Sequence, residues 1–406
     1  MSEVPKIKKV LMILENPFPH DERVEKEIRT LMDQKYDVHL LCSDRYGQMH
    51  EEMYKGIRIF RMYQSKFWYK LSALILIFPI YLKKWYRFAK KLHLEHKYNI
   101  IHIHDLPLSK VGSKMKSRFG LKMVCDQHEY YSNWIVETAH YNTLPGRIVK
   151  KLSDWKSYEK KALSGADLVI TVEEPLRQQY IEEYGLHQDK IICLPNTPNK
   201  DIFHNDNVDP EKFSRYKDNF MVLYFGGIDI LRGIENMIKA IPEILKVIPD
   251  FKFVMAGKLY GGYDPMNTAK KIKVESHVDF IGWVNLEDMP SLIHRCDLGI
   301  FTPPSDRIEI NKTIATKNYQ FLVMNKPMIV GSATYMKLFT EEHGIGISVD
   351  ETDPRSIANG IISFAGNEKK SREVEKNCKS IGSAYYWEKT SKSLISGYQQ
   401  LVMKND

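Results

Sequence analysis

Cysteine is scarce in this chain, and its N-terminus has none of the features of a secretory signal. The five cysteines are scattered over 406 residues without a C-x-x-C pair, which excludes a disulfide framework and a zinc knuckle. The opening MSEVPKIKKVLMILEN leads directly into a strand and lacks an apolar signal region and a cleavage site. We therefore expect a cytoplasmic protein in a reducing compartment.

Acidic residues are also scarce in one region, which carries the whole excess of positive charge. The formal net charge is +8, and residues 61–120 alone contain 13 basic but only two acidic residues. A patch of this sign attracts membrane phospholipid, nucleic acid or an acidic substrate. No zinc-finger, RRM or KH signature accompanies it, so we expect no nucleic-acid partner.

The segment Lys66–Lys97 lies in this basic region and has two interpretations. Its apolar core between Lys70 and Lys83 has 12 residues, whereas a membrane-spanning helix needs about 20. Aromatic residues flank the core and lysines lie outside them, which is typical of a helix at a membrane interface; the aromatic residues are Trp68, Tyr69, Trp85 and Tyr86. The alternative is a buried helix with solvated lysine ends. Both interpretations can be true if one face of the helix is buried in the domain and another contacts the membrane. Peripheral contact with the inner face of an anionic plasma membrane is therefore one expectation.

Residues 221–258 predict a βαβ unit with an anion site in its first loop. The apolar run Met221–Phe225 ends at Gly226 and Gly227, and a helical apolar period begins at Ile234. Backbone N–H groups, a helix N-terminus and Arg232 come together between them, which suits a diphosphate. The two glycines are equally typical of a tight turn without a ligand.

The start of the chain predicts a second βαβ unit of a different kind. Apolar strands are expected over Lys8–Leu14 and Tyr36–Cys42, with Asp21 as the N-cap of the helix between them. There is no G-x-G-x-x-G, and the acidic residues Glu22 and Glu25 in the first helical turn repel phosphate. These features exclude nicotinamide or flavin binding here.

Histidines occur at the ends of two further predicted strands. His102 and His104 share one face of the strand Tyr98–His104, and we expect hydrogen-bonded structural residues rather than metal ligands. His128 follows the strand Leu121–Cys125, at the end where open α/β sheets place ligands. Glu129 lies beside it in the sequence.

Strands alternate with helices along the whole chain, which predicts an α/β protein with two doubly wound domains. We expect an N-terminal Rossmann-like domain over 1–200, a polar linker over 201–219 and a C-terminal Rossmann-like domain over 220–385. The remaining segment, 386–406, has an amphipathic pattern and is expected to pack back on the N-terminal domain as a helix.

Short motifs follow one another along the chain in a recognisable order. The first half contains Asp21-Glu-Arg-Val, Ile101-His-Ile-His-Asp105, Cys125-Asp-Gln-His-Glu129 and Leu194-Pro-Asn196. The second half contains Tyr224-Phe-Gly-Gly227, Arg232-Gly233, Ala256-Gly257, Phe280-Ile-Gly-Trp283 and Lys317-Asn-Tyr-Gln-Phe-Leu-Val-Met-Asn-Lys-Pro327. Over nearly the whole chain this ordered set resembles GT-B glycosyltransferases, most closely the retaining group 1 enzymes of glycosyltransferase family 4.

The resemblance implies a fold, a reaction and two substrates. Two Rossmann-like domains would face each other across a cleft, the first binding a glycan or lipid-linked acceptor and the second a UDP- or GDP-sugar. Transfer would retain the anomeric configuration and serve polysaccharide or cell-envelope glycan synthesis. The departing diphosphate must be stabilised, and the lack of any D-x-D pair agrees with a site that needs neither metal nor cofactor.

The resemblance also assigns residues to roles. Catalytic roles would belong to His128, Glu309 and Arg232. The donor-binding residues would be Gly226, Gly227, Arg232, Gly257, Asn311, Lys312, Lys317 and Gln320. On the acceptor side it suggests Asp21, Arg23 and Glu129; for Asp21 and Arg23 the alternative is helix capping and local salt pairing.

Three positions depart from the family pattern. The family usually has two cations in the first loop of the second domain, but Gly227 occupies the first of these positions. It also commonly has two glutamates separated by seven residues, which are replaced here by Lys312 and Gln320. These departures keep two alternatives open, a catalytically inactive GT-B partner protein and a nucleotide-sugar epimerase.

Overall fold

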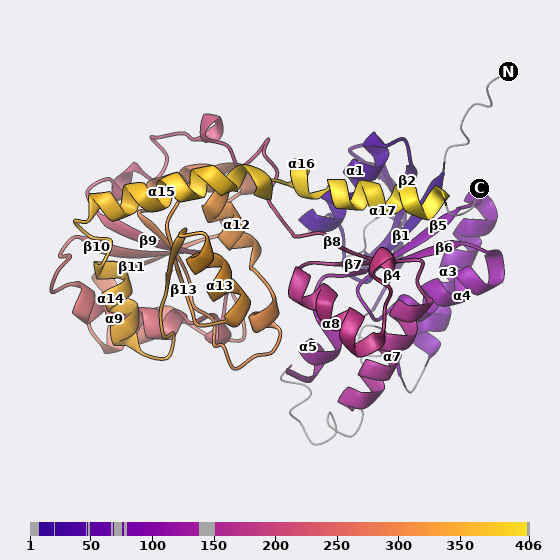
Figure 1. Cartoon of the computed structure of the whole chain (residues 1–406), viewed down its shortest axis with the longest axis horizontal. Helices are drawn as coiled ribbons and strands as arrows, with labels where there is room; N and C mark the ends of the chain where they lie inside the picture. Colours follow the sequence, from indigo (N-terminus) through magenta and orange to yellow (C-terminus); the bar gives the residue numbers. More distant parts are fainter. Residues whose placement is uncertain are drawn as a thin grey trace. The chain divides into compact units, whose positions relative to one another are not determined.

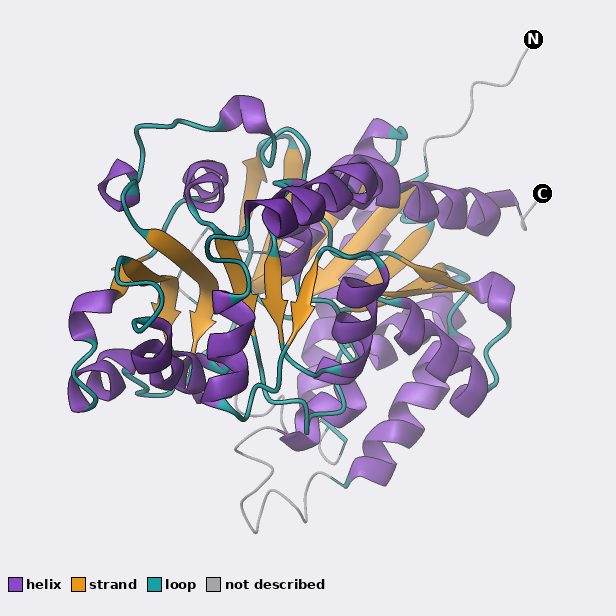
Figure 2. Ribbon diagram, turned by 60° about the vertical axis from the view of Figure 1, so that its left-hand side comes forward, coloured by secondary structure: helices purple, strands orange, loops and turns teal. Residues whose placement is uncertain are grey.

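The computed structural model describes residues 8–19, 21–45, 47, 49–65, 68, 75–76, 79–137 and 151–403. Contacts divide the chain into two compact units (Figure 1). The first unit comprises Met1–Pro195 and Ser391–Asp406, and the second comprises Asn196–Thr390. In each unit the helices cover both faces of a mostly parallel sheet (Figure 2), which confirms the predicted α/β class with two Rossmann-like domains.

The first unit contains an eight-stranded sheet in the order β3-β4-β2-β1-β5-β6-β7-β8. All neighbouring strands are parallel except β3 and β4, which form an antiparallel hairpin that the sequence analysis did not predict. Lys55 and Gly56 turn this hairpin with φ angles of 46° and 85°, a conformation that suits two-residue hairpin loops. The strands are β1 (Lys9–Leu14), β2 (Asp37–Asp44), β3 (Glu51–Tyr54), β4 (Ile57–Tyr63), β5 (Ile100–His104), β6 (Lys122–Gln127), β7 (Leu168–Thr171) and β8 (Ile191–Cys193).

The helices of the first unit follow the apolar periods of the sequence. They are α1 (Glu22–Asp33), α3 (Ile80–His96), α4 (Ser109–Phe119), α5 (Tyr131–Glu137), α7 (Leu152–Gly165), α8 (Glu174–Tyr184) and α17 (Lys392–Met403). The predicted N-cap of α1 is confirmed, because Oδ1 of Asp21 accepts the backbone N–H of Val24 at 3.1 Å. This bond satisfies one of the donors that every helix start leaves open.

Within the segment Lys66–Lys97, most of the described residues form helix α3. One face packs on the sheet through Tyr81, Leu82 and Trp85, while the opposite face carries Lys83 and Arg87. Trp85 is 0% exposed, so its expected position at a membrane interface is wrong. Residues 66–67, 69–74 and 77–78 lie outside the described residues. Within the described part of the chain, no helix is long and apolar enough to cross a membrane.

The second unit contains a parallel six-stranded sheet in the order β11-β10-β9-β12-β13-β14. Its strands are β9 (Phe220–Ile228), β10 (Phe251–Leu259), β11 (Val278–Gly282), β12 (Leu298–Phe301), β13 (Met328–Val330) and β14 (Gly346–Ser348). Its helices are α9 (Ile234–Ile244), α10 (Pro265–Lys271), α11 (Met289–Arg295), α12 (Thr316–Val323), α13 (Thr334–Glu342), α14 (Pro354–Ile362), α15 (Glu368–Gly382) and α16 (Trp387–Thr390). The carboxyl ends of all six strands therefore lie along one edge of the sheet, where such folds place ligands.

The unit boundaries differ from the predicted domain boundaries. The segment 201–219, predicted as a linker, packs within the second unit, because Phe203 is 2% and Tyr216 1% exposed in its core. The chain returns to the first unit at Ser391 rather than at residue 386, since the backbone N–H of Trp387 is bonded to the carbonyl of Pro198 at 2.9 Å. The sequence did not predict the packing of the segment 201–219, because its two buried aromatic residues, Phe203 and Tyr216, form no periodic pattern.

Candidate functional site

The glycines at the end of β9 allow two strands to approach closely. Gly226 and Gly257 are register partners in β9 and β10, and both have positive φ angles, of 120° and 144°. A Cβ atom on Gly257 would lie 1.9 Å from the carbonyl oxygen of Gly226. No side chain fits at Gly257, so glycine allows the two strands to meet at the carboxyl edge of the sheet, where such folds place ligands.

Arg232 lies in the turn between β9 and α9 and is partly held by its own loop. Its Nε atom is 3.2 Å from Oδ2 of Asp229, whose Oδ1 accepts the N–H of Leu231 at 2.8 Å. The Arg232 side chain is 36% exposed. The guanidinium is therefore oriented by Asp229 but still accessible, next to the N-terminus of α9, which begins after Gly233.

Lys317 supplies a second cation to the same place from the first turn of α12. Its ammonium nitrogen is 4.3 Å from the ring centroid of Tyr224 and 4.2 Å from that of Phe301. It also lies 3.2 Å from where a Cβ of Gly226 would be. Burial and the nearby charge of Arg232 hold the pKa of Lys317 well below its ordinary value, against the opposing effect of Asp229.

The environment of Lys317 favours an anion. Among the described residues, no carboxylate forms an ion pair with its ammonium group, which lies over the two aromatic rings. A buried cation without a counter-charge is costly, and a bound anion removes that cost. Lys317 thus brings a cation from another element to the backbone at Gly226, directly before Gly227, where the family usually has a cation.

The loop before α12 is held by its own polar side chains. The Asn311 amide nitrogen donates to the carbonyls of Ser305 and Arg307 at 2.6 and 2.9 Å, and its oxygen accepts the N–H of Thr334 at 2.8 Å. Glu309 pairs with Arg307 at 3.2 Å. Asn311, predicted to bind the donor, and Glu309, predicted to be catalytic, thus both make contacts within the loop. Lys312 follows in the same loop, and Gln320 is only 8% exposed in α12.

In the first unit, adjacent strands bring together a buried charged cluster. His104 of β5 and Asp126 of β6 are register partners, and Arg23 of α1 reaches both oxygens of Asp126 at 2.8 and 3.2 Å. Arg23 also donates to the carbonyl of Leu194 at 2.8 Å. Arg23 forms the predicted local ion pair, with Glu27 at 3.1 Å. Asp126, which it contacts through both carboxylate oxygens, is 103 residues away in the sequence.

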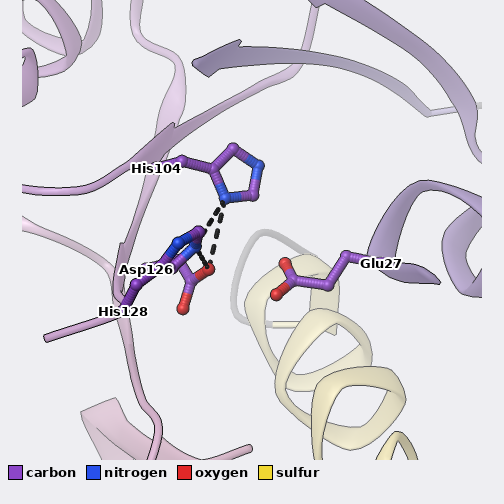
Figure 3. Close-up of side chains that lie close together, drawn as sticks. All are labelled: Glu27, His104, Asp126 and His128. Atoms are coloured by element: carbon purple, nitrogen blue, oxygen red, sulfur yellow. Dashed lines mark hydrogen bonds and ion pairs between the residues drawn. The ribbon is translucent and has the colours of Figure 1, made fainter. Parts of the chain in front are cut away.

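His128 contacts two carboxylates at the edge of this cluster, those of Asp126 and Asp105; Figure 3 shows its contact with Asp126. Its Nε2 atom is 2.6 Å from Oδ2 of Asp126, and its Nδ1 atom is 3.8 Å from Oδ2 of Asp105. Burial opposes the charge, but these two carboxylates raise the pKa of His128 to about 10. The ring is therefore an imidazolium whose Nδ1–H is not committed to a short hydrogen bond.

Five residues of the cluster were not predicted as site residues: Glu27, His102, His104, Asp105 and Asp126. Glu27 is fully buried and points toward Asp126 and His128 (Figure 3), and burial raises its pKa. His102 stacks on His104 with ring centroids 4.4 Å apart. The motifs H-x-H-D and D-x-H-E could have predicted this cluster, because they end two strands that neighbour each other in the sheet. The sequence around Glu27 could not have predicted its place in the cluster, since it is an ordinary helical sequence.

Four side chains of the cluster could in principle hold a metal ion. Within the described residues, one atom each of Glu27, His104, Asp126 and His128 lie within 4.8 Å of one another. Arg23 already pairs with both of the carboxylates, at 2.8 and 3.1 Å. The 2.6 Å contact between Asp126 and His128 is the length of a charge-assisted hydrogen bond. We therefore assign these residues to an ion-pair and hydrogen-bond network rather than to a metal site.

The two other residues predicted for the acceptor side also lie near this network. Asp21 caps α1 and Glu129 directly follows His128, where it is partly buried. The structure thus brings His128 and Arg23 together through their shared partner Asp126, with Asp21 and Glu129 near them in the sequence. The donor-side residues Gly226, Gly257, Arg232 and Lys317 form a separate group in the second unit.

Comparison with solved structures defines the class of the fold. Sucrose-phosphate synthase from Thermosynechococcus elongatus superposes with a TM-score of 0.75 at 17% identity, covering 98% of this chain and 100% of that one. HepE of Anabaena in complex with UDP gives a TM-score of 0.70 at 14% identity, covering 97% and 100% of the two chains. Together with the two Rossmann-like units, this likeness shows the GT-B fold.

Comparison of the sequence then identifies the family. The description "Glycosyltransferase Family 4" matches residues 23–199, and "Glycosyl transferases group 1" matches residues 205–381. An uncharacterised glycosyltransferase of Methanocaldococcus jannaschii is 23% identical over 310 residues, which cover 75% of each chain. The chain belongs to the group 1 glycosyltransferases of family 4, which transfer a sugar from a nucleotide sugar.

Proposed function

We propose that the protein is a retaining hexosyltransferase that needs no metal ion and uses a UDP- or GDP-sugar as donor. The acceptor is a glycan or a lipid-linked glycan in polysaccharide or cell-envelope glycan synthesis. The observation that carries this proposal is the ammonium group of Lys317, which lies beside Gly226 in an aromatic surround without a carboxylate partner.

The chemistry of the donor explains this arrangement. When the sugar leaves, negative charge develops on the diphosphate, and fixed positive groups stabilise it. Lys317, Arg232 and the N-terminus of α9 provide such groups from the protein itself. A metal ion is not needed for this role, because the same charge stabilisation comes from side chains and a helix dipole.

The first experiment measures nucleotide binding by calorimetry. We expect the wild type to bind one nucleoside diphosphate equally well with EDTA and with magnesium; UDP comes first because the similar HepE was solved with UDP. Lys317→Met should weaken binding about 10- to 100-fold, the scale of losing a hydrogen bond to a charged group. Lys270→Met, on the exposed part of α10 in the same unit, is the matched control. Magnesium-dependent binding, or full affinity in Lys317→Met, would contradict the proposal.

Turnover tests the role of the second cation. Arg232→Ala should lower kcat on the order of 10²- to 10³-fold, since it removes one charge-stabilising donor. An unchanged kcat would show that Arg232 has no part in the mechanism.

The stereochemistry of the product, measured by proton NMR of the anomeric position, decides between retention and inversion.

On the acceptor side, we propose that His128 donates a hydrogen bond to a substrate hydroxyl through Nδ1–H. Asp126 occupies Nε2, so Nδ1 is the nitrogen left for the substrate. His128→Gln keeps a donor without the charge, and we expect a smaller loss of kcat than in His128→Ala. Equal losses in the two variants would argue against this hydrogen bond.

The finer proposal on location concerns the basic face of α3. A groove of about 600 Å³ is lined by apolar residues that include Trp68 and Phe88. The charged residues that line it, among those the structure describes, are all basic: Lys83, Lys84, Arg87 and Lys91. Each basic residue near an anionic bilayer contributes about 1 kcal/mol. We propose that this face docks on the anionic inner leaflet and receives a lipid-linked acceptor there.

Liposome sedimentation at low salt tests the docking. The wild type should sediment with vesicles rich in anionic lipid but not with neutral ones, and replacing Lys83, Arg87 and Lys91 by Glu should abolish this. The control replaces Lys270, Lys271 and Lys273 of the second unit by Glu, which makes the same charge change. Equal loss of sedimentation in both triple variants would contradict a specific docking face.

Lys312 and Gln320 favour one alternative function, a nucleotide-binding partner without transferase activity. Both stand where the family commonly has glutamate, and Gln320 is nearly buried in α12. Nucleotide binding without hydrolysis or transfer to any of a broad acceptor panel would support this alternative. Conversion of the donor sugar without an acceptor would instead identify an epimerase.

A further inference from the structure

We propose that Tyr398 of the C-terminal helix α17 is a positioning residue for His128, acting through the tautomer of His102. The Tyr398 hydroxyl donates its proton to Nδ1 of His102, which fixes the His102 proton on Nε2, facing Glu27. The link to catalysis rests on the function proposed above, whereas the tautomer can be measured without it.

Tyr398 and His102 meet in the fully buried centre of the first unit. Both side chains are 0% exposed, and the hydroxyl oxygen lies 2.8 Å from Nδ1 of His102. The contact joins residues 296 positions apart in the chain. Packing of α17 against α1, β7 and β8 therefore delivers this hydroxyl to the strand that carries His104.

The direction of the hydrogen bond follows from what surrounds the hydroxyl. Within the described part of the chain, Nδ1 of His102 is the one hydrogen-bond partner of the Tyr398 hydroxyl, whose ring packs edge-on against Tyr36. If the hydroxyl accepted a proton from Nδ1, its own proton would be buried without a partner, which is costly. The hydroxyl therefore donates, and Nδ1 carries no proton.

The second nitrogen of His102 then has a defined role. Burial and the neighbouring His104 keep the pKa of His102 well below its ordinary value, so the ring is neutral and its single proton sits on Nε2. Nε2 lies 3.7 Å from Oε2 of Glu27, which is beyond hydrogen-bond distance, and the positive end of its N–H faces that oxygen. With the other tautomer, a lone pair would face the Glu27 oxygen instead.

From Glu27 the contacts lead to His128. Glu27 is 3.1 Å from Nε of Arg23, and Arg23 binds both oxygens of Asp126, which is 2.6 Å from Nε2 of His128. The His102 ring also stacks on His104, whose Nδ1 is 3.2 Å from Asp126. Two routes thus connect the His102 ring with the carboxylate that holds His128. Where such outer partners orient metal-ligating side chains, their loss commonly costs 10- to 100-fold, and we take the lower end of that scale for this network.

The test is nitrogen NMR of the full-length protein with ¹⁵N-labelled histidine, which distinguishes the tautomers of an imidazole. In the wild type we expect His102 as the neutral Nε2–H form, and its assignment comes from the signal lost in His102→Asn. Tyr398→Phe should give a mixture of tautomers and lower kcat about 10-fold, with the donor KM unchanged. Tyr184→Phe, which removes a buried hydroxyl from Glu159 in the same unit, is the control and should change neither readout.

Each outcome decides a separate point. A Nδ1–H tautomer in the wild type would overturn the inference, even if Tyr398→Phe failed to fold. A defined Nε2–H form in both proteins with unchanged kcat would also overturn it. Signals of His104 and His128 that shift on adding EDTA would reveal a bound metal and replace the hydrogen-bond chain. If the tautomer shifts as expected but no donor supports transfer, the structural link stands and the proposed function fails.

Discussion

Lys317 combines a buried position with a positive charge, and the two are in conflict until an anion is bound. Its neighbours are the rings of Tyr224 and Phe301, which attract a cation through their faces. That attraction is smaller than the cost of removing the charge from water, and the pKa of Lys317 is lowered accordingly. Protonation of Lys317 and binding of a diphosphate should therefore be linked.

We predict that donor binding takes up protons. The free pKa of Lys317 is lowered, and a bound diphosphate raises it, so affinity should fall as pH rises from the free to the bound pKa. Calorimetry of UDP binding at one pH in two buffers of different ionisation enthalpy measures the proton uptake. Lys317→Met should abolish it, whereas Lys270→Met should retain it. Proton release in the wild type would contradict this linkage.

His128 makes a second prediction, on stability. Its folded pKa of about 10 lies above the value near 6.5 expected in an unfolded chain. Its contribution is therefore fully present below pH 6.5 and is lost as pH rises through about 10. In urea unfolding between pH 6 and 10, the wild type should lose stability with rising pH, and His128→Gln should lose less. His187→Gln, at an exposed site, should follow the wild type; a slope in His128→Gln as steep as in the wild type would refute the assignment.

At this scale the sequence predicted local contacts better than distant ones. Asp21 lies three residues from the N–H that it caps, so its role could be predicted from spacing. Arg23 was expected to cap or to pair locally, and the partner that it clamps, Asp126, is in another strand. Glu27 and Tyr398 could not be predicted as members of the network that includes His128, because only the packing of α1 and α17 brings them to it.

At the scale of elements, the β9–β10 pair shows why glycine is required at the ligand edge. The sequence predicted strands that stop before the glycines, whereas β9 and β10 continue through Gly226 and Gly257 to Ile228 and Leu259. The backbones of β9 and β10 remain paired there because no Cβ atom separates the two strands. The apolar pattern could not reveal this, since glycine gives no hydrophobic signal.

We predict that Gly257→Ala destabilises the second unit by at least about 2 kcal/mol, through a strained φ of 144° and a clash with Gly226. Thermal unfolding measures the shift, and UDP binding should weaken as well. The control is Gly165→Ala at the end of α7, where a new Cβ meets nothing within 4 Å. Equal melting temperatures of Gly257→Ala and the wild type would contradict the close approach.

The hairpin β3–β4 and the segment 201–219 were missed for different reasons. The hairpin alternates polar and apolar residues over few positions at a sheet edge, and such short signals are weak. The segment 201–219 is mostly polar and is anchored only by Phe203 and Tyr216. In contrast, the long amphipathic helices and buried strands were predicted within a few residues of their observed ends.

At the scale of the whole molecule, α17 is the part of the first unit most distant in sequence from the rest. It buries Leu394, Tyr398 and Leu401 against that unit. We predict that a chain ending at Thr390 shows a lower melting temperature for the first unit only. Calorimetry should resolve two transitions, and the one raised by UDP, which belongs to the second unit, should stay in place. A shift of both transitions, or of neither, would contradict this division.

The path of the chain has a consequence for biosynthesis. The ribosome makes β8 of the first unit, then about 200 residues of the second, and only afterwards α17. At 5 to 20 residues per second, translation of that intervening stretch takes on the order of 10 to 40 s. During this interval the second unit can fold, whereas in the first unit the hydrogen bond between His102 and Tyr398 cannot yet form. Nascent chains would thus complete the proposed donor site before the network around His128, which needs α17.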